Sequence, residues 1–250
     1  MRSISSSLLV FALSTLSVAA SAQTAPASSL SFNVGVTSDY RYRAISQASF
    51  KPAIQAGVDF AHASGVYVGA WASNVSWIKD YVGATDGTTE IDLYGGYKGE
   101  ITSGVGFDVG AITYQYPGNT ADRVLANANT TELYAAVTVG AFTAKYSQST
   151  SNFMANTNSE GSRYLELAAT FDLGGGYSLT PHIGRQTIPN QAGNAGDYTD
   201  YALTLAKDFG NGLTGSLAFV TTDAKDAFYK VGTFDNLGKS GAVVGVKYTF

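Results

Sequence analysis

The sequence predicts an all-β protein: a closed antiparallel transmembrane β-barrel of about 12 strands, with short periplasmic turns and long external loops. Three observations predict this fold. Apolar and polar residues alternate with a period of two through nearly the whole chain after residue 22. Short glycine-rich links alternate strictly with long polar links. Charged residues, which are only 14% of the 250 residues, lie on the face opposite the apolar one.

The first 22 residues predict a secretory signal peptide. Arg2 supplies a positive charge, Leu8–Leu16 forms a short apolar core, and Ala20-Ser21-Ala22 fits a small-residue cleavage site. That core is far shorter than the roughly 20 residues that cross a bilayer as a helix. We therefore expect Sec export with removal of the signal peptide (1–22), followed by a short leader (23–29) and the barrel (30–250).

The period of two predicts each strand in turn. Leu133, Ala135, Val137 and Val139, for example, alternate with residues of a more polar face. The expected strands lie near residues 30–42, 52–63, 66–77, 89–98, 105–116, 130–139, 141–150, 162–172, 177–187, 198–208, 213–223 and 240–250.

The links between these strands favour an outer-membrane barrel over a soluble one. Short links contain glycine, which adopts positive φ without steric cost. They lie at 64–65, 99–104, 140, 174–176 and 210–212. The long links lie at 43–51, 78–88, 117–129, 151–161, 188–197 and 224–239. An even number of strands places both ends of the barrel on the periplasmic side, so that the long links are external.

The positions of the charged residues indicate which face of the predicted wall points inward. A dry core could not hold this many charges without a severe desolvation cost, whereas a wet lumen could. We therefore expect a lumen lined by the charged residues and one histidine of the polar face. The candidates are Asp39, Arg41, Arg43, Asp59, Glu90, Asp92, Asp108, Glu132, Lys145, Glu166, His182, Asp200 and Lys247.

Aromatic residues near the strand ends predict interfacial girdles in contact with outer-membrane lipid. The expected periplasmic girdle comprises Phe32, Phe60, Phe107, Phe142, Phe171 and Tyr177, and the external one comprises Tyr40, Tyr42 and Trp77. The last strand ends in an aromatic residue. Phe250, with Tyr248 and Val246 on the same face, is the expected signal for the barrel assembly machinery.

Several segments carry a family resemblance. They are SDYRYRAISQ (38–47), KPAIQAGVDFAHASGVYVGAWASNVSW (51–77), TEIDLYGGYKGE (89–100), TTELYAA (130–136), HIGRQ (182–186) and DYTDY (197–201). The mature chain resembles the TorF family of Gram-negative porins, which implies an outer-membrane barrel with a channel role. That family usually has Gly after the second Arg, where this chain has Ala44. If the position needs positive φ, the first loop is strained or shaped differently here.

The sequence gives little support for catalysis, a metal or a cofactor. It has no Cys, two His, and no GxSxG, HExxH or phosphate-binding glycine loop. His62 lies beside a short turn and His182 lies within a strand. We expect no enzyme, no cofactor and no nucleic-acid partner, because Lys and Arg are not clustered. A barrel hydrolase that uses one of the histidines is the least favoured alternative.

The predicted function is passive diffusion of small solutes through a narrow, mildly cation-preferring channel. Eight inward acids face four inward bases, which disfavours polyanions. Tyr94, Tyr114, Tyr134 and Tyr164 share the parity of the acids. They either line a passage or belong to a packed, hydrogen-bonded interior. The alternative function is a non-conducting structural or adhesive barrel that acts through its external loops.

Overall fold

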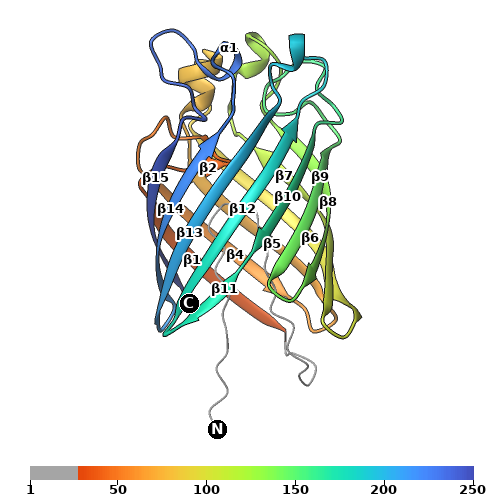
Figure 1. Cartoon of the computed structure of the whole chain (residues 1–250). Coiled ribbons are helices and arrows are strands. Elements are labelled where there is room, and N and C mark those ends of the chain that lie inside the picture. The colour runs from red at the N-terminus through yellow and green to blue at the C-terminus, as the bar shows by residue number, and fades with distance from the viewer. Residues whose placement is uncertain (1–27) are drawn as a thin grey trace.

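The computed structural model describes residues 28–250 as a closed antiparallel barrel of twelve strands (Figure 1). The predicted signal peptide and residues 23–27 of the predicted leader lie outside the described residues. The wall strands are β1 (Ser29–Thr37), β4 (Ala53–Ala61), β5 (Val66–Asn74), β6 (Thr89–Thr102), β7 (Val105–Gln115), β8 (Thr130–Val139), β9 (Phe142–Ser149), β10 (Arg163–Ala169) continued by β11 (Phe171–Gly174), β12 (Tyr177–Thr187), β13 (Tyr198–Gly210), β14 (Leu213–Thr222) and β15 (Gly241–Thr249).

The sheet closes because each wall strand has a neighbour on both sides. β1 pairs with β4 on one side and with β15 on the other. β10 likewise pairs with both β9 and β12. A closed sheet leaves no row of unpaired backbone groups, which is what a spanning β-structure requires in lipid. The predicted fold class is therefore confirmed, although several boundaries differ. The first strand ends at Thr37, the third ends at Asn74, the fourth extends to Thr102, and the eighth is interrupted at Thr170.

The two ends of the barrel differ as the link lengths predicted. All short turns lie at one end, here called the turn end, together with Phe250 and the start of β1 (Figure 1). In the turn 174–176 all three glycines have positive φ, from 59° to 80°. The long links gather at the opposite end, the loop end. They carry a π-helical turn (Ile78–Val82), two 3₁₀ turns (Ala121–Arg123 and Ala192–Asn194) and α1 (Asp226–Tyr229). Within residues 28–250, no helix is long and apolar enough to cross a membrane.

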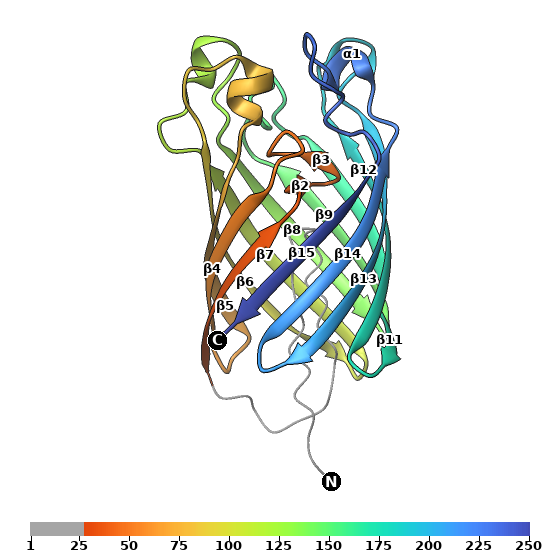
Figure 2. The same ribbon diagram turned by 90° about the vertical axis from the view of Figure 1, so that its left-hand side faces the viewer.

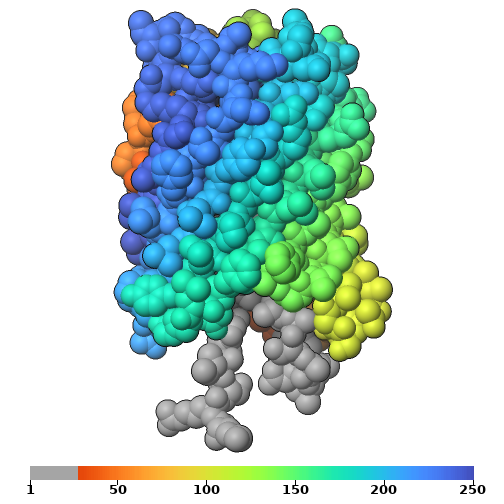
Figure 3. Space-filling view, viewed as in Figure 1, coloured from red at the N-terminus to blue at the C-terminus, as the bar shows by residue number. Residues whose placement is uncertain are grey.

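In the wall, apolar side chains are exposed and polar side chains are buried, the reverse of the pattern in a soluble protein. On β8, the Leu133 side chain is 55% exposed while the neighbouring Glu132 is 1% exposed. The same alternation runs around the wall, and its side chains pack into a continuous outer face (Figure 3). Most of the turn-end aromatics predicted as a girdle point outward, including Phe142 and Phe171, as do Phe250 and Tyr248 at the chain end. Whether the last strand is read by an assembly machinery stays a prediction.

The predicted external girdle is wrong. Tyr40, Tyr42 and Trp77 are all at most 7% exposed and lie inside the barrel at the loop end. There they belong to a cluster of buried apolar side chains with Tyr116, Phe153 and other loop residues. Aromatic residues near strand ends fit either position. Here Tyr40 and Tyr42 lie on the segment that follows β1, and Trp77 packs against Tyr116.

Candidate functional site: the lumen

The segment after β1 folds back into the barrel. β2 (Arg41–Tyr42) and β3 (Ile45–Ser46) pair only with each other, and Figure 2 shows them inside the outline of the wall near the loop end. We call residues 39–47 the inner hairpin. Its turn is Arg43-Ala44, with φ values of 47° and 64°. Positive φ at both central residues is the mark of a two-residue type I′ turn, whose twist matches that of paired strands.

This arrangement corrects the predicted positions of Asp39, Arg41 and Arg43. We predicted them on the wall as part of the first strand, followed by an external loop at 43–51. They lie instead on the inner hairpin, which is buried throughout. The positive φ of Ala44 confirms that this position needs the conformation that glycine adopts most easily.

Arg43 fixes the tip of the inner hairpin to the wall. Its Nη2 lies 2.7 Å from Glu132 Oε2 and its Nη1 lies 3.0 Å from Oε1, so the pair is bidentate. Nη1 also donates to Gln186 Oε1 at 2.8 Å. The guanidinium stacks on the rings of Tyr164 and Tyr42, at 4.2 and 4.7 Å from their centroids. Burial by itself would lower the pKa of Arg43, but Glu132 raises that pKa well above its ordinary value.

Arg41 closes the base of the hairpin. Its Nε lies 2.6 Å from Asp39 Oδ2, and Asp39 Oδ1 accepts a hydrogen bond from Ser46 Oγ at 2.6 Å. Arg41 Nη1 donates to the backbone carbonyls of Ala44 and Lys239, at 3.0 and 2.8 Å. The second of these bonds ties the hairpin to the loop that precedes β15.

A third anchor joins the hairpin to β6. Tyr40 donates from its hydroxyl to Glu90 Oε1 at 2.8 Å. Burial, reinforced by the charge of Glu90, raises the pKa of Tyr40, so this phenol stays protonated and can donate. Asp92 lies on the same face of β6. Among residues 28–250, Glu90 Oε2 and Asp92 Oδ1 are buried without a hydrogen-bond partner.

His182 lies between two carboxylates on neighbouring strands. Its Nε2 is 3.1 Å from Glu166 Oε2, and its Nδ1 is 3.4 Å from Asp200 Oδ1. Tyr164 donates to both oxygens of Asp200, at 3.1 and 3.0 Å. Among residues 28–250, no serine or threonine hydroxyl forms a hydrogen bond with His182. Residues 28–250 also hold no group of three or more His, Cys, Asp or Glu placed to bind a metal.

His62 lies in a different setting at the turn end. Its Nδ1 is 2.8 Å from Ser64 Oγ in the exposed turn between β4 and β5. The ring also accepts from the backbone N–H of Ser64 at 3.1 Å, so this contact closes the turn.

The turn-end half of the lumen is polar, and some of its side chains, including Asp59 and Tyr94, are only half-buried. Tyr94 donates to Asp59 at 2.5 Å, and Tyr67 donates to Asp108 at 2.6 Å. Three lysines of the lumen are also half-buried: Lys98, Lys145 and Lys247.

Sequence reasoning missed several residues of the lumen, including Lys98 and Gln186. Lys98 lies 5.5 Å from the centroid of the Tyr67 ring, inside the barrel. Gln186 is fully buried and binds Arg43. The period-two alternation could have identified both residues. Lys98 is an even number of residues from Glu90 on β6, and Gln186 is an even number from His182 on β12, so each shares the inward face of its strand.

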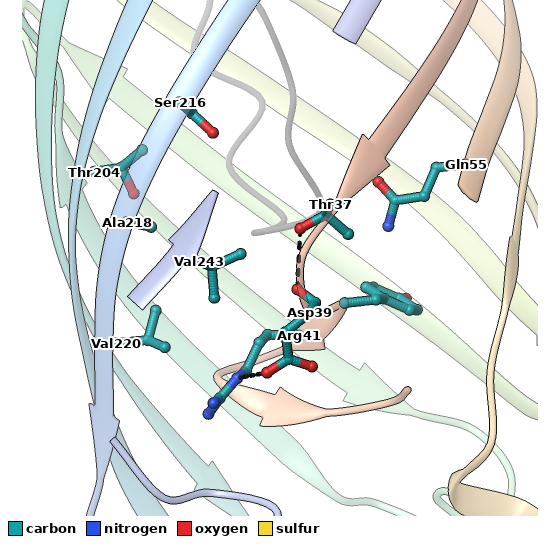
Figure 4. Close-up of a pocket in the computed structure, with 10 residues that line it drawn as sticks. Thr37, Asp39, Arg41, Gln55, Thr204, Ser216, Ala218, Val220 and Val243 are labelled. Carbon is teal, nitrogen blue, oxygen red and sulfur yellow. Dashed lines mark hydrogen bonds and ion pairs between the residues drawn. The ribbon is translucent and has the colours of Figure 1, made fainter. Parts of the chain in front are cut away.

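Little space remains between the inner hairpin and the wall. Figure 4 shows a gap where Thr37, Asp39 and Arg41 face Thr204, Ser216 and Val243 of the adjoining strands β13, β14 and β15. Its volume is about 50 Å³. A water molecule takes about 30 Å³ of liquid, so the gap has room for one or two waters.

A closed twelve-stranded antiparallel barrel with an apolar outer face and a charged interior defines the transmembrane β-barrel class. Solved structures share the fold. The KdgM porin in complex with disordered oligogalacturonate is similar with a TM-score of 0.54 and 8% identity, over 89% of this chain and 99% of that one. The NanC porin is similar with a TM-score of 0.55 and 10% identity, over the same shares.

The chain belongs to the family described as "Bacterial protein of unknown function (Gcw_chp)", whose model matches residues 21–250. This match does not confirm the TorF name that the sequence resemblance suggested. A comparison with curated proteins gave no match.

Proposed function

We propose that the protein is an outer-membrane channel for passive diffusion of small solutes, narrowed at its loop end by the inner hairpin. One observation carries the proposal: the wall has an apolar outside and a charged, hydrogen-bonded inside around a lumen. This distribution suits lipid on one side and water on the other. The likeness in fold to the KdgM and NanC porins supports it.

The location and orientation follow from the same physics. A sheet without edges and with exposed leucine, valine and phenylalanine on its outer face is stable in a bilayer, where every backbone group must pair internally. The predicted signal peptide supports export. We place the turn end at the periplasm and the loop end outside the cell, as in other outer-membrane barrels.

The narrow half of the lumen favours cations. Acids outnumber bases at the level of the inner hairpin, and charged rings select ions by sign. The acids there are Asp39, Glu90, Asp92, Glu132, Glu166 and Asp200. The bases are Arg41, Arg43 and Lys145, which is directly opposite Glu166 in the register of β9 and β10. Oligogalacturonate, which occupies the KdgM structure, is a polyanion. We propose small cations and neutral solutes as the cargo of this chain.

Planar-bilayer recording of the refolded protein tests the proposal. We expect small, discrete conductance steps and a reversal potential that shows mild cation preference at low salt. The preference should fade at 1 M salt, because the Debye length falls from about 10 Å at 0.1 M to about 3 Å. Replacing Glu90 with Gln and Asp92 with Asn together should move the reversal potential toward anions at alkaline pH, where both carboxyls are ionised. Among residues 28–250, the arginine ion pairs are with other acids. The matched control replaces exposed Asp172 and Asp208 with Asn at the turn end and should change nothing.

The alternative is a non-conducting structural or adhesive barrel. The filled loop-end half of the lumen is the observation that favours it. Absence of any conductance, both in the wild type and after removal of the inner hairpin, would establish that alternative and exclude the channel. A hydrolase has less support, because His182 contacts carboxylates and a phenol in place of a serine nucleophile.

A further inference from the structure

A second cavity lies at the loop end, on the outer side of the inner hairpin. Its volume is about 230 Å³, and all six long loops contribute side chains to it. Tyr42 and Ile45 belong to the inner hairpin and Phe153 to the β9–β10 loop, while Leu125 and Val231 are about half-exposed at the rim. We call this space the mouth cavity. Convergence of six separate loops on one space is typical of a binding site carried on a rigid scaffold.

The chemistry of the mouth cavity is the opposite of the lumen beneath it. None of the residues that line it carries a charge, although the hairpin that forms part of it bears two arginines and an aspartate. Seven lining residues are aromatic: Tyr42, Trp77, Tyr81, Phe153, Tyr198, Phe228 and Tyr229.

The hydroxyl groups of the four tyrosines that line the mouth cavity already form hydrogen bonds within the protein. Tyr198 donates to the Arg43 carbonyl at 3.0 Å and Tyr229 donates to the Gly196 carbonyl at 2.6 Å. Tyr42 contacts Glu132 at 3.2 Å, and Tyr81 donates to the Asp235 carbonyl. The tyrosines therefore offer ring carbon to the cavity in place of hydrogen-bond donors.

We propose that the mouth cavity binds a small, neutral aromatic molecule of one or two rings. An apolar cavity of about 150 Å³ in another protein holds benzene, so 230 Å³ suits a substituted single ring or a fused pair. Ring faces and edges around the space match the offset and edge-to-face contacts that aromatic pairs prefer. The proposal rests on the proposed function only for the direction of entry, from outside the cell.

A cation is a poorer occupant than a neutral ring. Arg43 already lies 4.7 Å from the centroid of the Tyr42 ring and 5.6 Å from that of Phe153. A cationic ligand would meet that like charge and compete for the same ring faces. A neutral aromatic molecule meets neither cost.

The two tryptophans of the chain give a matched pair of reporters. Trp77 lines the mouth cavity, whereas Trp71 on β5 packs against Tyr40 at a ring distance of 5.2 Å. Trp71→Phe leaves Trp77 as the reporter, and Trp77→Phe leaves Trp71. Nitrobenzene, a neutral ring that quenches indole fluorescence, is the probe. In bilayer nanodiscs we expect saturable static quenching of Trp77, with half-saturation on the order of 1 mM, and only linear collisional quenching of Trp71.

Filling the cavity should remove the binding. Val82→Phe enlarges a lining residue and should raise the nitrobenzene concentration at half-saturation about tenfold, equivalent to about 1.4 kcal/mol of binding free energy. Val124→Phe makes the same change at an exposed loop residue outside the lining and should leave it unchanged. Leu125→Phe at the rim is a second filling variant, for use if Val82→Phe does not fold. Heat-modifiable gel migration reports folding for each.

Two results would overturn the proposal. Equal, linear quenching of both reporters would show that the probe only dissolves in the surrounding lipid. Stronger displacement of nitrobenzene by phenyltrimethylammonium than by toluene would show a cation site. None of these measurements needs conduction, so they separate failure of the mouth cavity from failure of the proposed channel.

Discussion

The two halves of the lumen are built by the same twelve strands but are filled differently. In the loop-end half, Glu90 and Gln186 are fully buried under the inner hairpin. In the turn-end half, Asp59 and Lys247 point to the same interior and are only half-buried. The alternation of the wall is unchanged between them. The difference indicates that the close packing of the loop-end half depends on one loop, the inner hairpin.

The halves also differ in charge. Acids outnumber bases around the hairpin, whereas near the turns Lys98 is opposite Asp108 and Lys247 lies near Asp59. Lys145 is opposite Glu166, between these two levels. Ion selectivity is set where the passage is narrowest, so the acidic half should dominate it. Removing the hairpin should therefore change the size of the current and also weaken its preference for cations.

Removal of the inner hairpin is the change with the largest expected effect. Thr37 and Ala53 are directly paired in the register of β1 and β4, so an Asn-Gly turn can replace residues 38–52. We expect a several-fold rise in single-channel conductance in planar bilayers. The control replaces residues 187–197 with Asn-Gly, because Gln186 pairs with Tyr198, and leaves the hairpin in place. An equal rise in both variants would show that the hairpin is not the obstruction.

The sequence predicted the wall well, for identifiable reasons. Leu133 and Glu132 differ in polarity because one meets lipid and the other the interior, and Gly174–Gly176 mark a turn because they take positive φ. Parity alone placed Glu90, Asp92 and Asp200 inside. These features are local, and a single sequence carries them.

The inner hairpin escaped prediction because its signal is not local. Asp39, Arg41 and Arg43 alternate with a period of two, which a wall strand and a small hairpin share. What separates the two cases is the turn at Arg43-Ala44, and neither residue is a usual turn former. The glycine of the resembling family at this position was the available hint. The partners of the hairpin, such as Glu132 and Gln186, are distant in sequence.

Removing the ion pair between Arg43 of the inner hairpin and Glu132 of the wall should give the second-largest effect. Arg43→Ala leaves the buried Glu132 without a cation, although the hydroxyls of Tyr42 and Tyr114 still donate to it. Loss of one partner of a buried pair costs about 3–5 kcal/mol. We expect that loss in the free energy of unfolding by urea. Arg185→Ala, whose side chain is 50% exposed, is the control and should cost about 1 kcal/mol or less. The double variant Arg43→Ala with Glu132→Gln should recover part of the loss. If Arg43→Ala lowers the free energy of unfolding no more than Arg185→Ala does, the Arg43–Glu132 ion pair does not hold the hairpin in place.

Relieving the backbone strain at Ala44, in the turn of the inner hairpin, should give the smallest effect. Ala44 has a φ of 64°, a conformation that costs a residue with a Cβ roughly 1–2 kcal/mol. Ala44→Gly removes that cost but adds chain entropy to the unfolded state, so we expect a net gain of about 0.5–1 kcal/mol. Ala48→Gly, at a buried position without positive φ, should instead destabilise the protein. If both glycine variants lose stability alike, the turn at Ala44 is not as described.

Cysteine accessibility tests the central claim most directly. The chain has no Cys, so a single one can be introduced without background. Ala202 and Ala206 face the lumen on β13; Ala202 packs with Ala44 of the inner hairpin, whereas Ala206 is half-buried toward the turn end. In the folded barrel, a water-soluble thiol reagent should modify Ala206→Cys quickly and Ala202→Cys slowly, and replacing residues 38–52 with Asn-Gly should make the two rates similar. Equal rates with the hairpin present would contradict the account.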